Sequence, residues 1–315
     1  SPKLAIERAT APTFPGNFGP TRTILYSAMP AVRAVGYLSL TTAVCGCDVA
    51  DGCYGRQWDY TPSRYHHAVD IPKSHPRYKS LMTRELLVEM VGKGVVTPTG
   101  LISQGRGEAF DYMMGERTTA PAEDAERAAA AMLLLAENPV VCINGNAAAL
   151  DAESLIALAK AVPAKIEVNL FHRTPERMEA VISHLESKGA DVVLGRAPDE
   201  RIPGLDHDRA LCTREGIWSS DVILVPIEDG DRAEALVAMG KKVISIDLNP
   251  LSRTSKTCTV PICDEISRAT TNILRFVEEL RGDREATIKV SESFSGAECR
   301  RRTVDAICDA LKAGL

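Results

Sequence analysis

The stretch GRGEAFDYMMGE, residues 105–116, places an arginine between two glycines and follows it with two carboxylates. A guanidinium group binds phosphate well, and flanking glycines let the backbone come close to a ligand. Arg106 is therefore a candidate phosphate ligand. Glu108 and Asp111 either take part in chemistry or favour the N-terminus of a helix that opens at these glycines, and we favour the helix.

Further polar residues follow short apolar runs in the second half of the chain. Arg253 lies between two hydroxyl side chains, an arrangement that suits either a phosphate or a surface ion pair. Asp247 could bind a ribose hydroxyl or cap the next element. Asp229 and Asp231 could hold Mg²⁺ together with substrate phosphates, although a solvated acidic turn is the simpler alternative. The same positions also include Asn144, Asn146, Asn169, His172, Arg173, Glu228, Arg232, Asn249, Ser252 and Thr254, of which the Asn-Gly pair is also an ordinary turn former.

These polar residues require a sheet to bring them together, and the pattern of apolar runs predicts one. Six short, apolar, β-branched runs alternate with amphipathic helical stretches, which predicts a mainly parallel sheet with helices on both faces. We therefore expect a Rossmann-like α/β fold, in which ligands bind outside the carboxyl ends of the strands. The expected strands are residues 139–146, 165–171, 191–195, 221–226, 242–248 and 257–263.

Composition divides the chain and excludes some partners. Residues 1–69 are rich in Pro, Gly, Thr and Ala, and we expect a disordered or non-native leader or extension. Residues 70–138 form a helical segment, residues 139–284 the Rossmann-like core, and residues 285–315 a tail with one amphipathic helix. The net charge of −5 and the aromatic content of 5% argue against nucleic-acid binding. No run has the ~18–20 apolar residues of a membrane span.

Two standard nucleotide-binding signatures are missing. The chain contains no G-x-x-x-x-G-K-[ST] loop, and no G-x-G-x-x-G follows the first expected strand. GRGEAF lacks the third glycine and has no strand before it, so a dinucleotide-dependent oxidoreductase is disfavoured. A regulator that senses a nucleotide without turning it over remains the other alternative.

Several long strings, taken in order, resemble one family. They include IPKSHPRYKSL, GRGEAFDYMMGE, NGNAAAL, IPGLDHDR and IDLNPLSRT, and they run from about residue 70 to about residue 280. This part of the chain resembles archaeal phosphopantothenate synthetase, also called 4-phosphopantoate–β-alanine ligase. The resemblance implies a cytoplasmic homodimer that acts on small molecules. Its reaction converts 4-phosphopantoate, β-alanine and ATP to 4'-phosphopantothenate, AMP and diphosphate in archaeal coenzyme A synthesis, here taken to pass through an acyl-adenylate.

The resemblance also implies site residues. The ATP-binding positions fall on Arg84, Arg106, Asp247, Leu248, Asn249, Arg253, Thr254, Glu265 and Ile266. Candidates for binding the acid substrate are Arg77, Lys79, Asn144, Asn146, Arg173 and Arg232. Mg²⁺ is expected through the substrate phosphates, with Asp229 and Asp231 as candidate ligands, and Asp229, Asp231 or Glu108 is the candidate base. Gln104 stands where the family usually has His, and because an amide carries no proton at neutral pH, a catalytic role there is doubtful.

Overall fold

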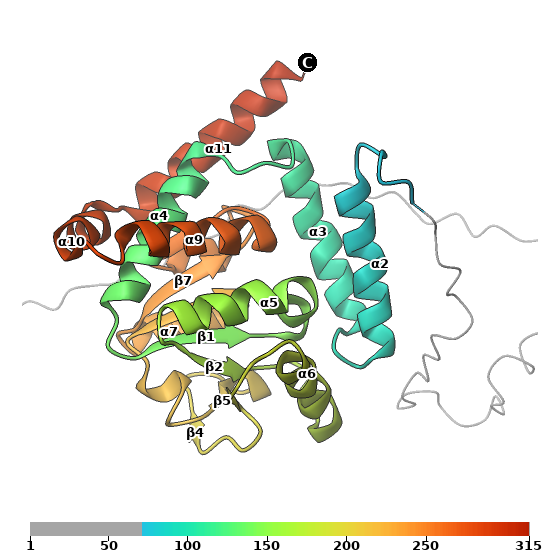
Figure 1. Ribbon diagram of the computed structural model, residues 1–315, viewed down its shortest axis with the longest axis vertical. Coiled ribbons are helices and arrows are strands. Elements are labelled where there is room, and N and C mark those ends of the chain that lie inside the picture. Colours follow the sequence, from blue (N-terminus) through green and yellow to red (C-terminus); the bar gives the residue numbers. More distant parts are fainter. Residues whose placement is uncertain (1–70, 315) are drawn as a thin grey trace, which may run out of the picture. The chain divides into compact units, whose positions relative to one another are not determined.

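The structure is a computed structural model that describes residues 71–314 (Figure 1). Its centre is a six-stranded parallel sheet in the order β3-β2-β1-β6-β7-β8. The chain winds outward from β1 in one direction and from β6 in the other, so the switch point lies between β1 and β6. This is the strand order of the dinucleotide-binding fold, and the predicted Rossmann-like α/β fold is confirmed. The strands are β1 (Pro139–Ile143), β2 (Lys165–Val168), β3 (Val193–Leu194), β6 (Val222–Pro226), β7 (Lys242–Ile246) and β8 (Val260–Ile262).

Helices cover both faces of the sheet because the strands are apolar on both sides. Every residue of β1 is buried; Val141 and Ile143 pack into one core, while Val140 and Cys142 pack into another. The first core lies under α4 (Ala120–Leu135), α5 (Gly145–Ala161), α6 (Pro175–Ser187) and α9 (Ile266–Leu280). The second lies under α7 (Gly230–Ala238), with α8 (Arg253–Thr257) packed beside it.

A small insertion between β3 and β6 completes the second core. It contains the antiparallel pair β4 (Glu200–Arg201) and β5 (Leu211–Cys212) and the short 3₁₀ helices η2 (Asp208–Ala210) and η3 (Ile217–Ser219). Strands β4 and β5 have two residues each and lie outside the apolar runs from which the strands were predicted, so sequence analysis does not find them.

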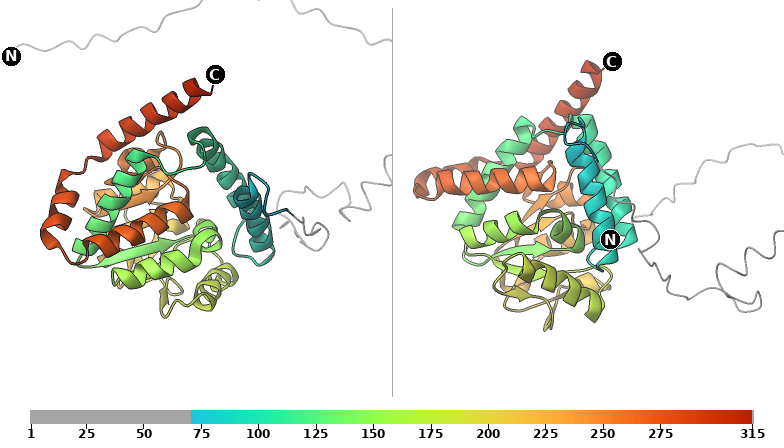
Figure 2. Two further views of the ribbon diagram at one scale, coloured as in Figure 1. Left: turned by 45° about the horizontal axis from the view of Figure 1, so that its top comes forward. Right: turned by 45° about the vertical axis from the view of Figure 1, so that its right-hand side comes forward.

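A helical hairpin stands beside the sheet, made of α2 (Tyr78–Gly92) and α3 (Pro98–Met114) (Figure 2). The expectation that a helix opens at the glycines of GRGEAF is wrong, because Gly105 and Gly107 lie inside α3. The helix begins earlier, where Thr97 accepts a hydrogen bond from the Gly100 N–H at 3.3 Å and proline follows at the first helical position. Glu108 and Asp111 are consequently far from the N-terminus of the helix.

The C-terminal region contains two helices, where the sequence suggested one. These are α10 (Arg284–Ser293) and α11 (Gly296–Ala313), and α11 packs against α4 and α3. Cys299 of α11 joins the main core, and Ile307 contacts the small cluster around Met114 and Cys263. The region is thus part of the folded domain. The expectations for residues 1–69 lie outside the described residues, and no helix between residues 71 and 314 has the length and apolarity to cross a membrane.

Candidate functional site

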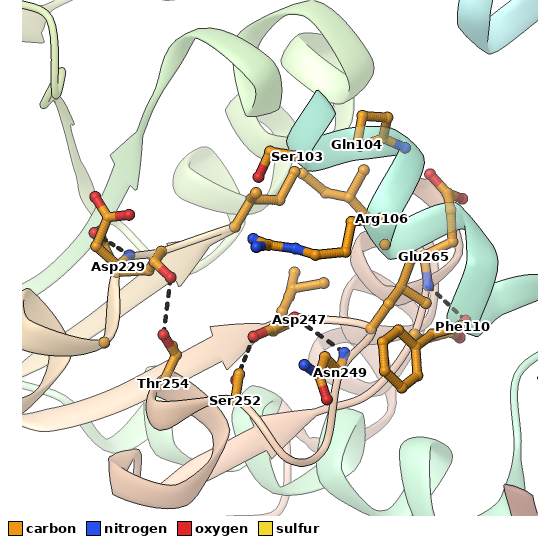
Figure 3. A pocket seen from close by; sticks show the side chains of 18 of the residues that line it. Ser103, Gln104, Arg106, Phe110, Asp229, Asp247, Asn249, Ser252, Thr254 and Glu265 are labelled. Atoms are coloured by element: carbon orange, nitrogen blue, oxygen red, sulfur yellow. Dashed lines mark hydrogen bonds between the residues drawn. The ribbon is translucent and has the colours of Figure 1, made fainter. Parts of the chain in front are cut away.

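A cavity of about 300 Å³ lies between α3 and the carboxyl ends of β6, β7 and β8 (Figure 3). We call it the central cavity. Eight of the nine positions that the family resemblance implies for ATP line it: Arg106, Asp247, Leu248, Asn249, Arg253, Thr254, Glu265 and Ile266. They come from α3 and from the segments that follow β7 and β8, so the fold gathers residues that are up to 160 positions apart in the chain. The remaining lining residues are Ser103, Gln104, Gly107, Phe110, Ile227, Glu228, Asp229, Gly230, Ile246, Ser252 and Asp264.

Arg106 is the one cationic residue of α3 (Pro98–Met114), and its exposed side chain lines this cavity. Figure 3 shows its side chain extending from α3 across the cavity, towards the side of Asp247 and Asp229. Within residues 71–314 it has neither a hydrogen bond nor an ion pair, although its charge acts on Asp247. A guanidinium group in this position is available to an anionic ligand.

Asp247 is fixed by its neighbours on the floor of the cavity. Its carboxylate accepts hydrogen bonds from the Ser252 hydroxyl at 2.5 Å and from the Asn249 N–H at 3.0 Å. Burial raises the pKa of Asp247, while these hydrogen bonds and Arg106 oppose the shift. Each carboxylate oxygen retains acceptor capacity, which suits a ligand hydroxyl group.

The turn that follows β6 forms part of the wall of the central cavity. Ile227 has a φ of 53°, which is an outlier for a β-branched residue, and such strained positions cluster at functional sites. Its carbonyl accepts a hydrogen bond from the Asn144 side chain at 2.9 Å, which ties the ends of β1 and β6 together. At Gly230, an added Cβ would lie 2.3 Å from Cβ of Arg253, so α7 and α8 approach each other only because this residue is glycine.

A buried ionic triad lies behind this turn. Glu228 is paired with both Arg209 and Arg232, and the three side chains are 2%, 4% and 0% exposed, respectively. Burial alone would raise the pKa of Glu228, but the two arginines hold it below its usual value. Arg232 also donates to Sγ of Cys142 at 3.5 Å. The structure therefore places Arg232, a sequence candidate for substrate binding, in the interior and away from the cavities.

Asp229 and Asp231 have different surroundings. Asp229 is half-exposed on the cavity wall, 3.2 Å from Nε of Arg209, and burial of its carboxyl raises its pKa. Asp231 accepts from the His207 ring at 2.8 Å and lines none of the cavities described here. The described residues hold no cluster of three or more metal-ligating side chains. Asp229 alone fits a Mg²⁺ ion that is held mainly by phosphate oxygens.

A second cavity, of about 330 Å³, lies at the β1–β6 switch point, and we call it the switch-point cavity. It shares Ser103, Ile227 and Asp229 with the central cavity. Its other lining residues are Thr97, Thr99, Gly100, Asn144, Gly145, Asn146, Leu170, Phe171, His172, Arg177 and Arg209.

The two asparagines of this cavity already have structural roles. Asn144 Oδ1 accepts from the Ala147 N–H at 3.0 Å and so caps α5. Asn146 donates to the Gly100 carbonyl at 2.9 Å and so joins α5 to α3. Both side chains hold the walls of the cavity in place, whatever contact they make with a ligand.

Arg84, the ninth implied ATP position, lies in a third cavity, next to α2. This cavity of about 340 Å³ shares Gln104, Leu248 and Glu265 with the central cavity. Arg84 is 2.7 Å from Glu108. Arg84 therefore shares a cavity with Leu248 and Glu265 but does not line the central cavity.

The remaining sequence candidates are held by protein partners. Within the third cavity, Arg77 contacts Glu108 at 3.2 Å, and Lys79 lies 3.5 Å from Glu265. The hydrogen bonds from Arg84 and Ser80 keep the pKa of Glu108 below its usual value, against the effect of burial. Arg173 donates to backbone carbonyls and lines a separate cleft.

Sequence reasoning missed several residues that the structure brings to the cavities, among them Ser103, Phe110, Arg177, Arg209 and Ile227. Arg177 belongs to the first turn of α6, and Arg209 to η2, so neither follows a strand directly. The string IPGLDHDR ends at Arg209 and was the available signal.

Comparison with known proteins gives one consistent result. A sequence model of the phosphopantothenate/pantothenate synthetase family matches residues 121–310, which include α10 and most of α11. The chain is 50% identical over 245 residues to a 4-phosphopantoate–beta-alanine ligase of Methanosarcina mazei, covering 78% of this chain and 96% of the relative. The chain is 56% identical over 213 residues to a 4-phosphopantoate–beta-alanine ligase of Methanospirillum hungatei, and the match covers 68% of this chain and 87% of the relative.

A third relative agrees with these two. The 4-phosphopantoate–beta-alanine ligase of Thermococcus kodakarensis is 51% identical over 232 residues, which cover 73% of this chain and 89% of the relative. The match includes the C-terminal helices that the sequence resemblance had left out. On this similarity, and with a Rossmann-like sheet as its core, the chain belongs to the phosphopantothenate/pantothenate synthetase family.

Proposed function

We propose that this protein is an ATP-dependent ligase that joins 4-phosphopantoate to β-alanine. The products are 4'-phosphopantothenate, AMP and diphosphate, and the reaction is a step of coenzyme A synthesis. The relatives named above support the pair of substrates. The observation that carries the nucleotide assignment is Arg106, which extends without a protein partner among the described residues over a cavity lined by seven further implied ATP positions.

In the first step, a carboxylate oxygen of the acid attacks the α-phosphorus of ATP, and the bond to the bridging oxygen breaks as diphosphate leaves. Two anions must approach each other, so the site has to offset their repulsion with fixed positive charge. Arg106 supplies that charge from α3, and Arg253 supplies it from α8 once it releases Glu234, which lies 2.6 Å away. Asp229 would help the phosphate oxygens to hold Mg²⁺, which would add positive charge there until the diphosphate leaves.

In the second step, the amine of β-alanine attacks the acyl carbon, and the bond to AMP breaks. The amine must lose a proton, and Asp229 is the best-placed base of the three candidates. It lies on the wall that the two cavities share, and its raised pKa brings it closer to neutral pH. Glu108 has a lowered pKa in the third cavity, and Asp231 is engaged with His207.

The proposal includes a homodimer, because the family resemblance implies one. Ile102 and Tyr112 of α3 are 75% and 63% exposed, and a partner subunit that covered them would bury apolar surface. Light scattering of the purified protein would measure the mass directly, and a monomeric mass would remove this part of the proposal.

One assay tests the function. Incubation of ATP, 4-phosphopantoate and β-alanine should give 4'-phosphopantothenate with equal amounts of AMP and diphosphate. Formation of ADP and phosphate would replace the acyl-adenylate with an acyl phosphate. Binding of ATP without any product would instead favour a nucleotide sensor.

The variant Arg106→Ala tests the nucleotide site. It should reduce kcat/KM by at least 100-fold, because a charged group that contacts the reacting phosphates is lost, while the circular dichroism spectrum stays unchanged. Arg301→Ala is a matched control, since Arg301 is an exposed arginine on α11. Near-normal activity of Arg106→Ala would show that Arg106 does not bind the phosphates.

A further inference from the structure

The side chain of Arg268, near the start of α9, joins two elements that border the central cavity. Its Nε donates to Asp264 at 2.9 Å and its Nη1 donates to Asp111 at 3.3 Å, while Nη2 is ion-paired with both carboxylates. Each nitrogen of this guanidinium group therefore has a protein partner, whereas Arg106 has none among the described residues. A planar guanidinium presents its donors as a rigid fork, so it holds two carboxylates in a defined geometry.

The Asp264 end of this bridge fixes the turn between β8 and α9. The Asp264 side chain is buried, and one of its oxygens accepts a hydrogen bond from the Thr118 hydroxyl at 2.5 Å. The oxygen that accepts from Arg268 also accepts from the backbone N–H of Glu265 at 2.7 Å. Glu265 and Ile266 follow directly and line the central cavity. Their positions therefore depend on how this carboxylate is held.

The Asp111 end of the bridge fixes α3. Asp111 is buried and lies on the same helix as Arg106, five positions further along the chain. That separation is about 7.5 Å along the axis of a helix, so holding Asp111 also holds the backbone of Arg106. The other acidic residue of α3, Glu108, pairs with arginines in α2 or next to it. Within residues 71–314, Arg268–Asp111 is thus the one ion pair that joins α3 to α9.

We propose that Arg268 is a positioning residue, which holds α3, and with it Arg106, at a fixed place relative to the start of α9. This inference rests on the proposed function, in which these elements bind ATP. Arg268 acts through Arg106 and does not itself contact the nucleotide. The stabilisation that a charged group gives to reacting phosphates depends on its exact placement, so a small displacement of α3 weakens ATP binding and slows the reaction.

The test is a double-mutant cycle between Asp111→Ala and Arg106→Ala, measured as the Kd for ATP in calorimetric titrations. Asp111→Ala leaves Arg268 paired with Asp264 and places a good helix former in α3, so the circular dichroism spectrum should not change. The variant should bind ATP about 10- to 100-fold more weakly, as expected for the loss of a charge-assisted hydrogen bond. When Arg106 is already alanine, the same change should weaken binding less than twofold, because the group through which Arg268 acts is absent.

Two further variants support the cycle. In Arg268→Lys, an ammonium group keeps the positive charge beside Asp264 but lacks the fork that holds two carboxylates, so ATP binding should again weaken at least tenfold. Asp305→Ala is the matched control, because Asp305 pairs with Arg301 at 3.0 Å on the exposed face of α11, and its Kd for ATP should not change. The cycle is also measured as kcat/KM for ATP, which covers the case in which Arg106→Ala binds too weakly for titration.

These measurements separate this inference from the proposed function. Protein that binds ATP with the expected dependence on Asp111 but makes no 4'-phosphopantothenate would refute the proposed function alone. Active protein whose Kd for ATP is the same in Asp111→Ala, in Arg268→Lys and in the native form would refute this inference alone. Equal weakening by Asp111→Ala with and without the Arg106 side chain would also refute it, because Asp111 would then not act through Arg106.

Discussion

The buried ionic triad of Arg209, Glu228 and Arg232 should contribute measurably to the free energy of unfolding. In Glu228→Gln, two guanidinium groups that are 4% and 0% exposed lose their shared carboxylate. Removing one partner of a buried ion pair costs about 3–5 kcal/mol, because the remaining charge is left uncompensated. For a domain of this size, that corresponds to a fall in Tm of roughly 6–20 °C.

Thermal and urea unfolding followed by circular dichroism would measure the loss. Glu298→Gln is the matched control, since Glu298 pairs with Arg301 at 2.6 Å on the surface of α11, where such a pair contributes about 0–1 kcal/mol. The pKa of Glu228 is lowered, so its stabilisation is present above the unfolded pKa and disappears as pH falls below it. A loss under about 1 kcal/mol at neutral pH, or one equal to that of the control, would refute the reasoning.

Two other predictions concern packing and protonation. Glu126 is fully buried beside Asp264, and burial raises its pKa to about 9, so its stabilising contribution is complete below pH 4.5 and is lost as pH rises towards 9. The variant Glu126→Gln should flatten that decline and raise the free energy of unfolding at pH 8–9, by at most several kcal/mol at about 1.36 kcal/mol per pKa unit. An unchanged dependence of the free energy of unfolding on pH, measured by urea denaturation, would contradict this. Gly230→Ala would push its Cβ against Arg253 and should raise the KM for ATP at least tenfold. At Gly105, an added Cβ would meet no described atom within 4 Å beyond its chain neighbours and the backbone of its own helix, so Gly105→Ala should keep that KM and stabilise α3 by about 0.5–1 kcal/mol. Equal effects of the two changes would contradict the reasoning.

The sheet was predictable because its strands are buried on both faces. Runs such as Pro139–Ile143 and Val222–Pro226 are continuously apolar, and helices separate them. This pattern predicts a parallel α/β fold. The start of α3 was not found, because two glycines in its interior resemble a turn more than a helix. Thr97 followed by proline was the better signal.

The site was predictable only in part, for a related reason. Residues that follow a strand directly, such as Asp247, can be placed from the strand pattern alone. Arg177 and Arg209 reach the switch point from α6 and from an irregular insertion, and no local pattern connects them to it. Arg232 does follow a strand, yet its helix turns it inward to Glu228. Side-chain direction depends on tertiary packing, and the sequence pattern does not contain it.

The order of the sheet places the two cavities on different parts of the chain. The segment from β1 to α6 supplies seven of the fourteen residues that line the switch-point cavity, whereas β6 to α9, with α3, supply the central cavity. Substitutions in one cavity should therefore leave the lining of the other unchanged, provided that they avoid Ser103, Ile227 and Asp229. At those three positions, which line both cavities, one substitution changes both linings, so strong epistasis with substitutions in either cavity is the expected outcome.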